Sequence, residues 1–280
     1  MAKSSIQIEP GDGVGAYISA INLKEGLTTE QARELKRALG EYGVLFFRDQ
    51  DISPEQHIAF AEQFGAININ RFFASVDNYP MIAEVRKEPD QKVNIGGQWH
   101  TDHSYDIEPA LGSVLLARQT PTRGGDTLFA NMYTAYESLS DGMKKTLATM
   151  RAVHSSRHQF GAEANYSKER EGRLSNRDAA QQDSVHPVVI THPISGRKAL
   201  YVNTAFTIRF DGWTADESEP LLKQLYEHAA RPEFTHRFHW APGSIAFWDN
   251  RATQHYALND YQGQFRLMHR ITVEGEALPA

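Results

Sequence analysis

The stretch Trp99-His100-Thr101-Asp102 carries an imidazole and a carboxylate two positions apart. If this segment is extended, both side chains leave the same face of the backbone and can hold one cation together. The best source of a third ligand is the downstream stretch Phe247 to His255. His100, Asp102 and His255 then make a set of two histidines and one carboxylate. Such a set occupies one face of an iron ion and leaves the opposite positions open, as in non-haem Fe(II) oxygenases.

Three further motifs accompany this first one in a fixed order. They are Gly124-Gly125-Asp126-Thr127, then Trp-Asp-Asn-Arg-x-Thr-Gln-His-Tyr ending at Tyr256, then Arg266-x-Met-His-Arg270. The complete set resembles the taurine dioxygenase (TauD/TfdA) family of Fe(II)- and 2-oxoglutarate-dependent dioxygenases. The likeness runs from about Phe47 nearly to the C-terminus. A lone His-x-Asp would carry little weight, but four motifs at compatible separations are a strong signal.

The fold is predicted to be mainly β with flanking helices. The C-terminal half reads as many short strands separated by Pro and Gly turns, which is typical of a sandwich or barrel. The resemblance implies a double-stranded β-helix (jelly roll, cupin-like core) formed by one domain over residues 1–280. Cap signals predict helices that start after Thr28 and Ser53, the latter ending at Gly65, and further helices that start at Thr134, Ser140 and Thr214.

The resemblance also implies how the cosubstrate is held. Arg266 is expected to bind the distal carboxylate of 2-oxoglutarate, and Thr127 to add a hydroxyl to the same group. A guanidinium suits this task because its planar fork makes two charge-assisted hydrogen bonds to one carboxylate. With Fe(II) and O2, the family converts 2-oxoglutarate to succinate and CO2 and hydroxylates a substrate carbon.

The last motif carries a second arginine, Arg270, on the same face of the predicted strand Phe265 to Val273 as Arg266. The two lie roughly 13 Å apart along an extended strand. By family likeness Arg270 holds the anionic head group of the substrate. The alternative is that Arg270 only pairs with a buried Asp or Glu, since such networks are often structural.

The substrate contacts implied by the resemblance depart from those of taurine-specific members. Those members have a histidine where this chain has Asn70 and a tyrosine at the position of Phe73. Their substrate-binding asparagine falls on Gly96, or on Asn94 in a shifted alignment. Losing a strong donor at a buried anion site costs about 1.5 to 3 kcal/mol. Taurine is therefore disfavoured.

An apolar body on the substrate is the competing expectation. Phe160 and Phe206 are further expected substrate contacts, and together with the aromatic side chains near residue 72 they favour a longer sulfonate, an alkyl sulfate, an aryloxyalkanoate or another carboxylate. A non-catalytic protein that binds 2-oxoglutarate or an anion is the rival from another class. The carboxylate of Asp102 argues against that rival, because its loss would be the easiest route to an inactive site.

Composition limits the partners. The chain has 280 residues, a formal net charge of -6 and no cysteine. It has no concentrated basic run, so nucleic acid is an unexpected partner. No apolar stretch approaches the length of a membrane span, and no secretory signal is apparent, so a cytoplasmic enzyme is expected. A homo-oligomer, dimer or tetramer, is expected by family analogy alone.

Two further local features stand out in the chain. The stretch from 161 to 184 is highly polar and nearly free of large apolar residues, which indicates a lid over the iron site. His103 follows the metal motif directly, and a structural role is preferred for it over a substrate contact.

Overall fold

A computed structural model gives the architecture of the chain, and it describes residues 6–161, 164, 174 and 176–278. Its largest sheet follows the order β1-β2-β3-β15-β7-β17-β6-β5, with β4 paired to β17. The members are β1 (Gln7–Pro10), β2 (Ala16–Ser19), β3 (Val44–Phe47), β4 (Ile67–Asn68), β5 (Ser75–Val76), β6 (Tyr79–Lys87), β7 (Gly112–Gln119), β15 (Ile245–Asp249) and β17 (Arg266–Val273).

Three smaller sheets complete the β structure. The first has the order β14-β8-β16, the second β10-β9-β13, and the third pairs β11 with β12. Their members are β8 (Thr127–Asn131), β9 (Arg151–Ser155), β10 (Asp183–Pro187), β11 (Val189–Thr191), β12 (Lys198–Leu200), β13 (Thr207–Phe210), β14 (Thr235–Phe238) and β16 (Thr253–Ala257).

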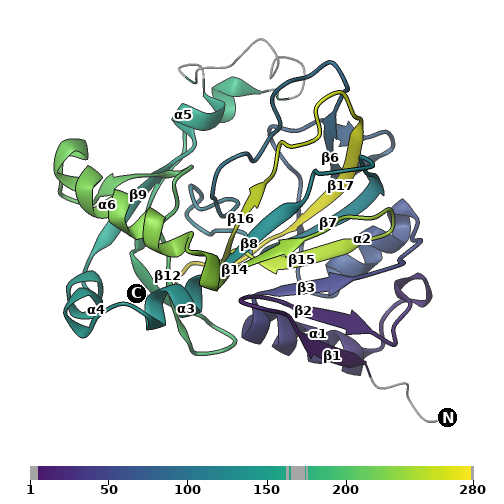
Figure 1. Ribbon diagram of the computed structural model, residues 1–280, viewed down its shortest axis with the longest axis horizontal. Helices are drawn as coiled ribbons and strands as arrows, with labels where there is room; N and C mark the ends of the chain where they lie inside the picture. The colour runs from purple at the N-terminus through teal and green to yellow at the C-terminus, as the bar shows by residue number, and fades with distance from the viewer. Residues whose placement is uncertain (1–5, 162–163, 165–173, 175, 279–280) are drawn as a thin grey trace.

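The helices flank these sheets. They are α1 (Thr29–Tyr42), α2 (Pro54–Glu62), α3 (Met132–Glu137), α4 (Asp141–Leu147), α5 (Arg157–Phe160) and α6 (Ala215–Ala229), with short 3-10 turns at Leu23–Glu25, Arg177–Ala179 and Pro232–Phe234. In Figure 1, α3, α4 and α6 gather on the side away from the large sheet. No helix in the described ranges is long and apolar enough to cross a bilayer.

The core that joins the large sheet to β14-β8-β16 is aromatic. Phe46 on β3 stacks on Phe238 of β14 with ring centroids 4.5 Å apart, and it meets Phe129 of β8 edge-on at 5.6 Å. Trp248 and Met268 belong to the same buried cluster. Two sheets packed face to face through such a core form the jelly roll that was predicted. A second apolar cluster lies where α1 and α2 cover the large sheet.

Cap residues explain where most helices begin. Thr28, Ser53 and Thr214 each form a complete capping box, and Ser140 accepts from the backbone of α4, as predicted. The predicted start of α3 was wrong. Asn131 is the N-cap, because its Oδ1 accepts the N–H groups of Tyr133 and Thr134.

Two predicted boundaries were also wrong. The second helix ends at Glu62, before Gly65. A Cβ on Gly65 would lie 2.9 Å from a methyl carbon of Val273, so this glycine permits close packing against β17 instead of ending the helix. The predicted strand Val185 to Thr191 is divided after Pro187, because β10 pairs with β9 while β11 pairs with β12.

His57 on α2 is a fully buried imidazole, and neither ring nitrogen meets a partner with hydrogen-bond geometry among the described residues. Burial lowers the pKa of His57 to about 3, and the nearby charges of Arg118 and His269 act in the same direction. Between the ordinary histidine pKa and this value, the unfolded chain binds a proton that the folded chain does not. Stability is therefore lost as the pH falls below about 6.5.

We expect the variant His57→Leu to lose less stability than the wild type when the pH falls below about 6.5. Leucine is similar in size to histidine, but its side chain is apolar and cannot be protonated. Between pH 8 and pH 5, the free energy of unfolding of the variant should fall by about 2 kcal/mol less than that of the wild type. Urea unfolding at both pH values measures this change. Parallel pH profiles for the two proteins would contradict the assignment.

Candidate active site

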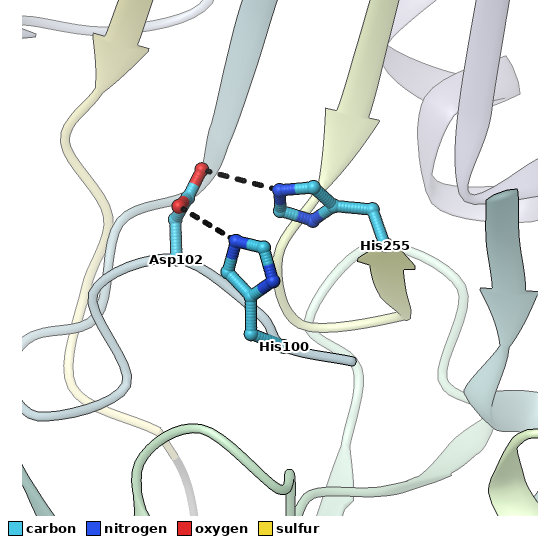
Figure 2. A group of neighbouring side chains, drawn as sticks. All are labelled: His100, Asp102 and His255. Carbon is cyan, nitrogen blue, oxygen red and sulfur yellow. Dashed lines mark ion pairs between the residues drawn. The ribbon is translucent and has the colours of Figure 1, made fainter. Parts of the chain in front are cut away.

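Three side chains from distant segments converge on one point of the fold. Figure 2 shows His100, Asp102 and His255 directed toward one another. The Nε2 atom of His100 lies 3.8 Å from Asp102 Oδ1, and that of His255 lies 4.0 Å from Asp102 Oδ2. One ligand atom from each lies within 4.8 Å of the others, and all three residues are buried. The set has the spacing and the donor types of a two-histidine, one-carboxylate metal centre.

Backbone pairing explains the placement of the two histidines. His255 lies on β16, and it exchanges two hydrogen bonds with His100, of 2.8 Å and 3.1 Å. The rings therefore lie side by side with centroids 4.0 Å apart. The backbone pairs with β16 at His100, but the motif is not extended throughout, because Asp102 lies in a turn followed by His103 with a φ of 59°. Asn250 orients this turn by accepting the Asp102 N–H at 3.2 Å.

Neighbouring polar groups set the protonation and the orientation of the candidate metal ligands. His100 Nδ1 lies 2.8 Å from the Gln98 carbonyl oxygen. Because a carbonyl oxygen can only accept a hydrogen bond, Nδ1 carries the proton, and the lone pair of Nε2 is left for a metal. Ser113 donates its hydroxyl to Asp102 Oδ2 at 2.9 Å. Burial alone would raise the pKa of Asp102, but the Arg270 guanidinium above all holds this pKa below its ordinary value. Burial lowers the pKa of His255, so its imidazole is neutral, as a metal ligand must be.

A cavity of about 350 Å³ lies beside the three ligands. Of the predicted cosubstrate and substrate residues, it is lined by Asn70, Phe73, Thr127, Phe160, Phe206, Arg266 and Arg270. Asn94 does not line it among the described residues, because its side-chain amide donates to the Ala257 carbonyl at 2.8 Å. The backbone of Gly96 and Gly97 occupies that part of the wall.

Arg266 is a buried cation, and no acidic side chain in the described part of the chain forms an ion pair with it. Its Nε and Nη2 atoms have no hydrogen-bond partner among the described residues, and burial lowers the pKa of its guanidinium. Thr127 accepts the indole N–H of Trp240 at 3.0 Å, which leaves its own hydroxyl proton free to be donated. The centre of the Trp240 ring also lies 5.9 Å from the Arg266 guanidinium carbon. A carboxylate fits this place, since it would supply the missing acceptors.

Arg270 stands between the metal ligands and the aromatic part of the cavity. Its Nη1 lies 3.3 Å from Asp102 Oδ1, and its Nε has no hydrogen-bond partner in the described part of the chain. The guanidinium carbon lies 4.7 Å from the centre of the Phe73 ring. Arg270 thus pairs with a buried aspartate and also lines the cavity.

The aromatic wall is larger than the sequence indicated. Phe72 and Phe160 stack with centroids 4.5 Å apart and an interplanar angle of 14°. Tyr105 packs edge-on against Phe206 at 4.9 Å and lines the cavity as well. Neither Tyr105 nor Trp240 was predicted as a site residue. For Tyr105 the available signal was its position three residues after Asp102. For Trp240 it was the alternation of Phe234, His236, Phe238 and Trp240 at every second position ahead of β15.

The stretch predicted as a lid is described by the structure only in part. Residues 162–163, 165–173 and 175 of the predicted lid lie outside the described residues. The described Ala164 and Leu174 line the cavity, and Leu174 forms a β-bridge with Phe73. His103 Nδ1 lies 2.9 Å from Asp106 Oδ2, which accords with a structural role, although His103 also lines the cavity.

A jelly roll that carries this ligand set beside a buried arginine, with two nitrogens that meet no hydrogen-bond partner among residues 6–161, 164, 174 and 176–278, defines a non-haem metal oxygenase dependent on 2-oxoglutarate. Comparison with known proteins places the chain more narrowly. The family model described as "Taurine catabolism dioxygenase TauD, TfdA family" matches residues 7–272, and the chain belongs to that family. It is therefore a 2-oxoglutarate-dependent dioxygenase of the non-haem iron type.

Individual relatives extend over almost the whole chain. An alkylsulfatase from Acinetobacter baylyi is 37% identical over 267 residues, covering 94% of this chain and 83% of the relative. A taurine dioxygenase from Burkholderia xenovorans has a similar structure, with a TM-score of 0.82 and 34% identity over 98% of this chain and 92% of that one. AAD-2 in complex with Mn(II) and N-oxalylglycine gives a TM-score of 0.81 and 30% identity over 99% and 100%.

Proposed function

We propose that this enzyme uses Fe(II), O2 and 2-oxoglutarate to hydroxylate the carbon next to the anionic group of a small organic acid with an apolar body. The observation that carries the proposal is the pair of buried arginines on β17. Each guanidinium lies beside the same cavity and has at least one nitrogen that meets no hydrogen-bond partner within the described ranges. Two anionic ligands would balance the charges of these two buried guanidinium groups. Iron held by His100, Asp102 and His255 would supply the oxidising chemistry when O2 is bound.

The protein's own side chains then position the two organic ligands. Arg266 and Thr127 bind the distal carboxylate of 2-oxoglutarate, while Arg270 holds the anionic group of the substrate. Phe73 and Phe206 exclude water around the carbon that reacts. Holding both ligands in fixed orientations is the main contribution that a protein makes to this type of reaction.

The lining of the cavity favours an alkyl sulfate or a longer sulfonate over taurine. Among the described lining residues the only carboxylate is Asp102, a metal ligand, so the ammonium group of taurine would find no counter-ion. The aromatic wall suits an alkyl chain instead. Likeness to the alkylsulfatase supports a sulfate ester. Hydroxylation of the carbon that bears a sulfate ester gives an adduct that breaks its C–O bond, releasing an aldehyde and sulfate.

We expect hexyl sulfate and hexanesulfonate to exceed taurine by at least about tenfold in kcat/KM, because each buried CH2 group contributes about 0.8 kcal/mol. Succinate release, measured with Fe(II), 2-oxoglutarate and a panel that also holds aryloxyalkanoates, gives the ranking. Preference for taurine would contradict the proposed substrate class. Absence of substrate-dependent succinate across the whole panel would favour the non-catalytic binding protein.

Cytoplasmic location and homo-oligomeric assembly belong to the same proposal. The absence of cysteine is compatible with a reducing compartment. Apolar side chains exposed at Ile69, Ile107 and Trp213 are candidate contact points between copies of the chain.

A further inference from the structure

Asn70 was predicted as a direct substrate contact, but its side-chain oxygen is already engaged. Oδ1 accepts the backbone N–H of Phe72 at 2.9 Å and that of Phe73 at 3.0 Å. This closes an Asx turn, in which an asparagine side chain takes the place of a backbone carbonyl. We propose that Asn70 is a positioning residue, which acts through Phe73 on the substrate-binding guanidinium of Arg270. The inference rests on the proposed function of Arg270.

The turn places two consecutive phenylalanines in different parts of the cavity wall. Phe72 stacks on Phe160, while Phe73 presents its ring to Arg270 with the guanidinium carbon 4.7 Å from the ring centre. Both rings are buried, with exposed fractions of 1% and 9%. Because one side-chain oxygen binds both backbone N–H groups, it fixes the direction of both rings.

Arg270 depends on that ring for its orientation. Its hydrogen bonds to Asp102 are long, at 3.3 Å and 3.4 Å, and its Nε has no hydrogen-bond partner among the described residues. Asp102 itself is shared with Ser113 and with the metal site. The face of Phe73 is therefore the contact that sets the plane of the guanidinium, through an attraction that strengthens when water is excluded.

A guanidinium held in one plane offers a pair of parallel N–H groups. It matches an anion that presents two oxygens at once, such as a sulfate, a sulfonate or a carboxylate. Loosening the turn should therefore weaken binding of the substrate anion and leave binding of 2-oxoglutarate, the proposed ligand of Arg266, unaffected.

The test compares Asn70→Ser with Asn70→Ala, because serine keeps an acceptor oxygen for the turn and neither residue can donate an amide N–H to a ligand. Calorimetry on the Mn(II)-loaded protein with 2-oxoglutarate gives the Kd of hexyl sulfate without turnover. We expect Asn70→Ala to raise this Kd about tenfold, and Asn70→Ser to stay within about threefold of the wild type. The Kd of 2-oxoglutarate should change less than about twofold in both.

A double-mutant cycle with Phe73→Leu separates the two roles of Asn70. If Asn70 acts through the ring, Asn70→Ala adds little in the Phe73→Leu background. Equal losses in the serine and alanine variants, or a full additional loss in that background, would overturn the inference and assign Asn70 to direct binding. Failure of the wild type to bind hexyl sulfate would overturn it as well. Binding without succinate release would refute only the proposed reaction.

Discussion

Replacing Arg266 with leucine should raise the Kd of 2-oxoglutarate by about 100-fold or more and, at the same time, make the protein without this ligand more resistant to unfolding. The first effect follows because a buried carboxylate that loses its cationic partner costs about 3 to 5 kcal/mol. The second follows because Nε and Nη2 of Arg266 are buried without hydrogen-bond partners among the described residues. Removing such donors relieves roughly 1 to 3 kcal/mol.

Calorimetry with the Mn(II)-loaded protein and chemical unfolding of the ligand-free protein measure the two effects separately. The matched control is Arg86→Leu on β6, since that arginine is exposed, pairs with Glu88 and faces Leu267 in the register with β17. Its affinity for 2-oxoglutarate should equal that of the wild type. A lower stability of the Arg266→Leu protein, together with unchanged affinity, would show that this guanidinium is a structural element and not the cosubstrate site.

Replacing Asp102 with asparagine should lower the affinity for Mn(II) at least about 100-fold and abolish substrate-dependent succinate release. The change removes the only anionic ligand of the metal set while it keeps the size of the side chain and one oxygen. Paramagnetic resonance titration with Mn(II) measures the binding directly, without relying on activity.

A graded comparison makes this result specific. Ser113→Ala removes the hydroxyl that donates to Asp102 Oδ2, and it should weaken Mn(II) binding by about tenfold. Asp51→Asn changes a carboxylate whose side chain is 99% exposed, and it should bind Mn(II) as the wild type does. Undiminished Mn(II) affinity in the Asp102→Asn protein would mean that the metal lies elsewhere.

Several parts of the fold were predictable because their signals are local. The capping boxes at Thr28, Ser53 and Thr214 depend on residues three positions apart, so the chain alone reveals where those helices begin. Asn131 was overlooked as the cap of α3 for a related reason. A competing threonine three residues later carries the same type of signal, and only the folded backbone shows which one accepts the N–H groups.

The residues of the candidate site also divide into those that could be predicted from the sequence and those that could not. The candidate metal ligands and the candidate cosubstrate arginine could be predicted from the chain alone, because His100, Asp102, His255 and Arg266 stand in motifs whose residue types suit one chemistry. Tertiary structure alone decided the rest: that Trp240 binds Thr127, that Asn94 faces the Ala257 carbonyl instead of the cavity, and that Asn70 closes a turn. The physical reason is that donor chemistry belongs to each residue type, whereas a hydrogen-bond partner is set by packing between segments far apart in the chain.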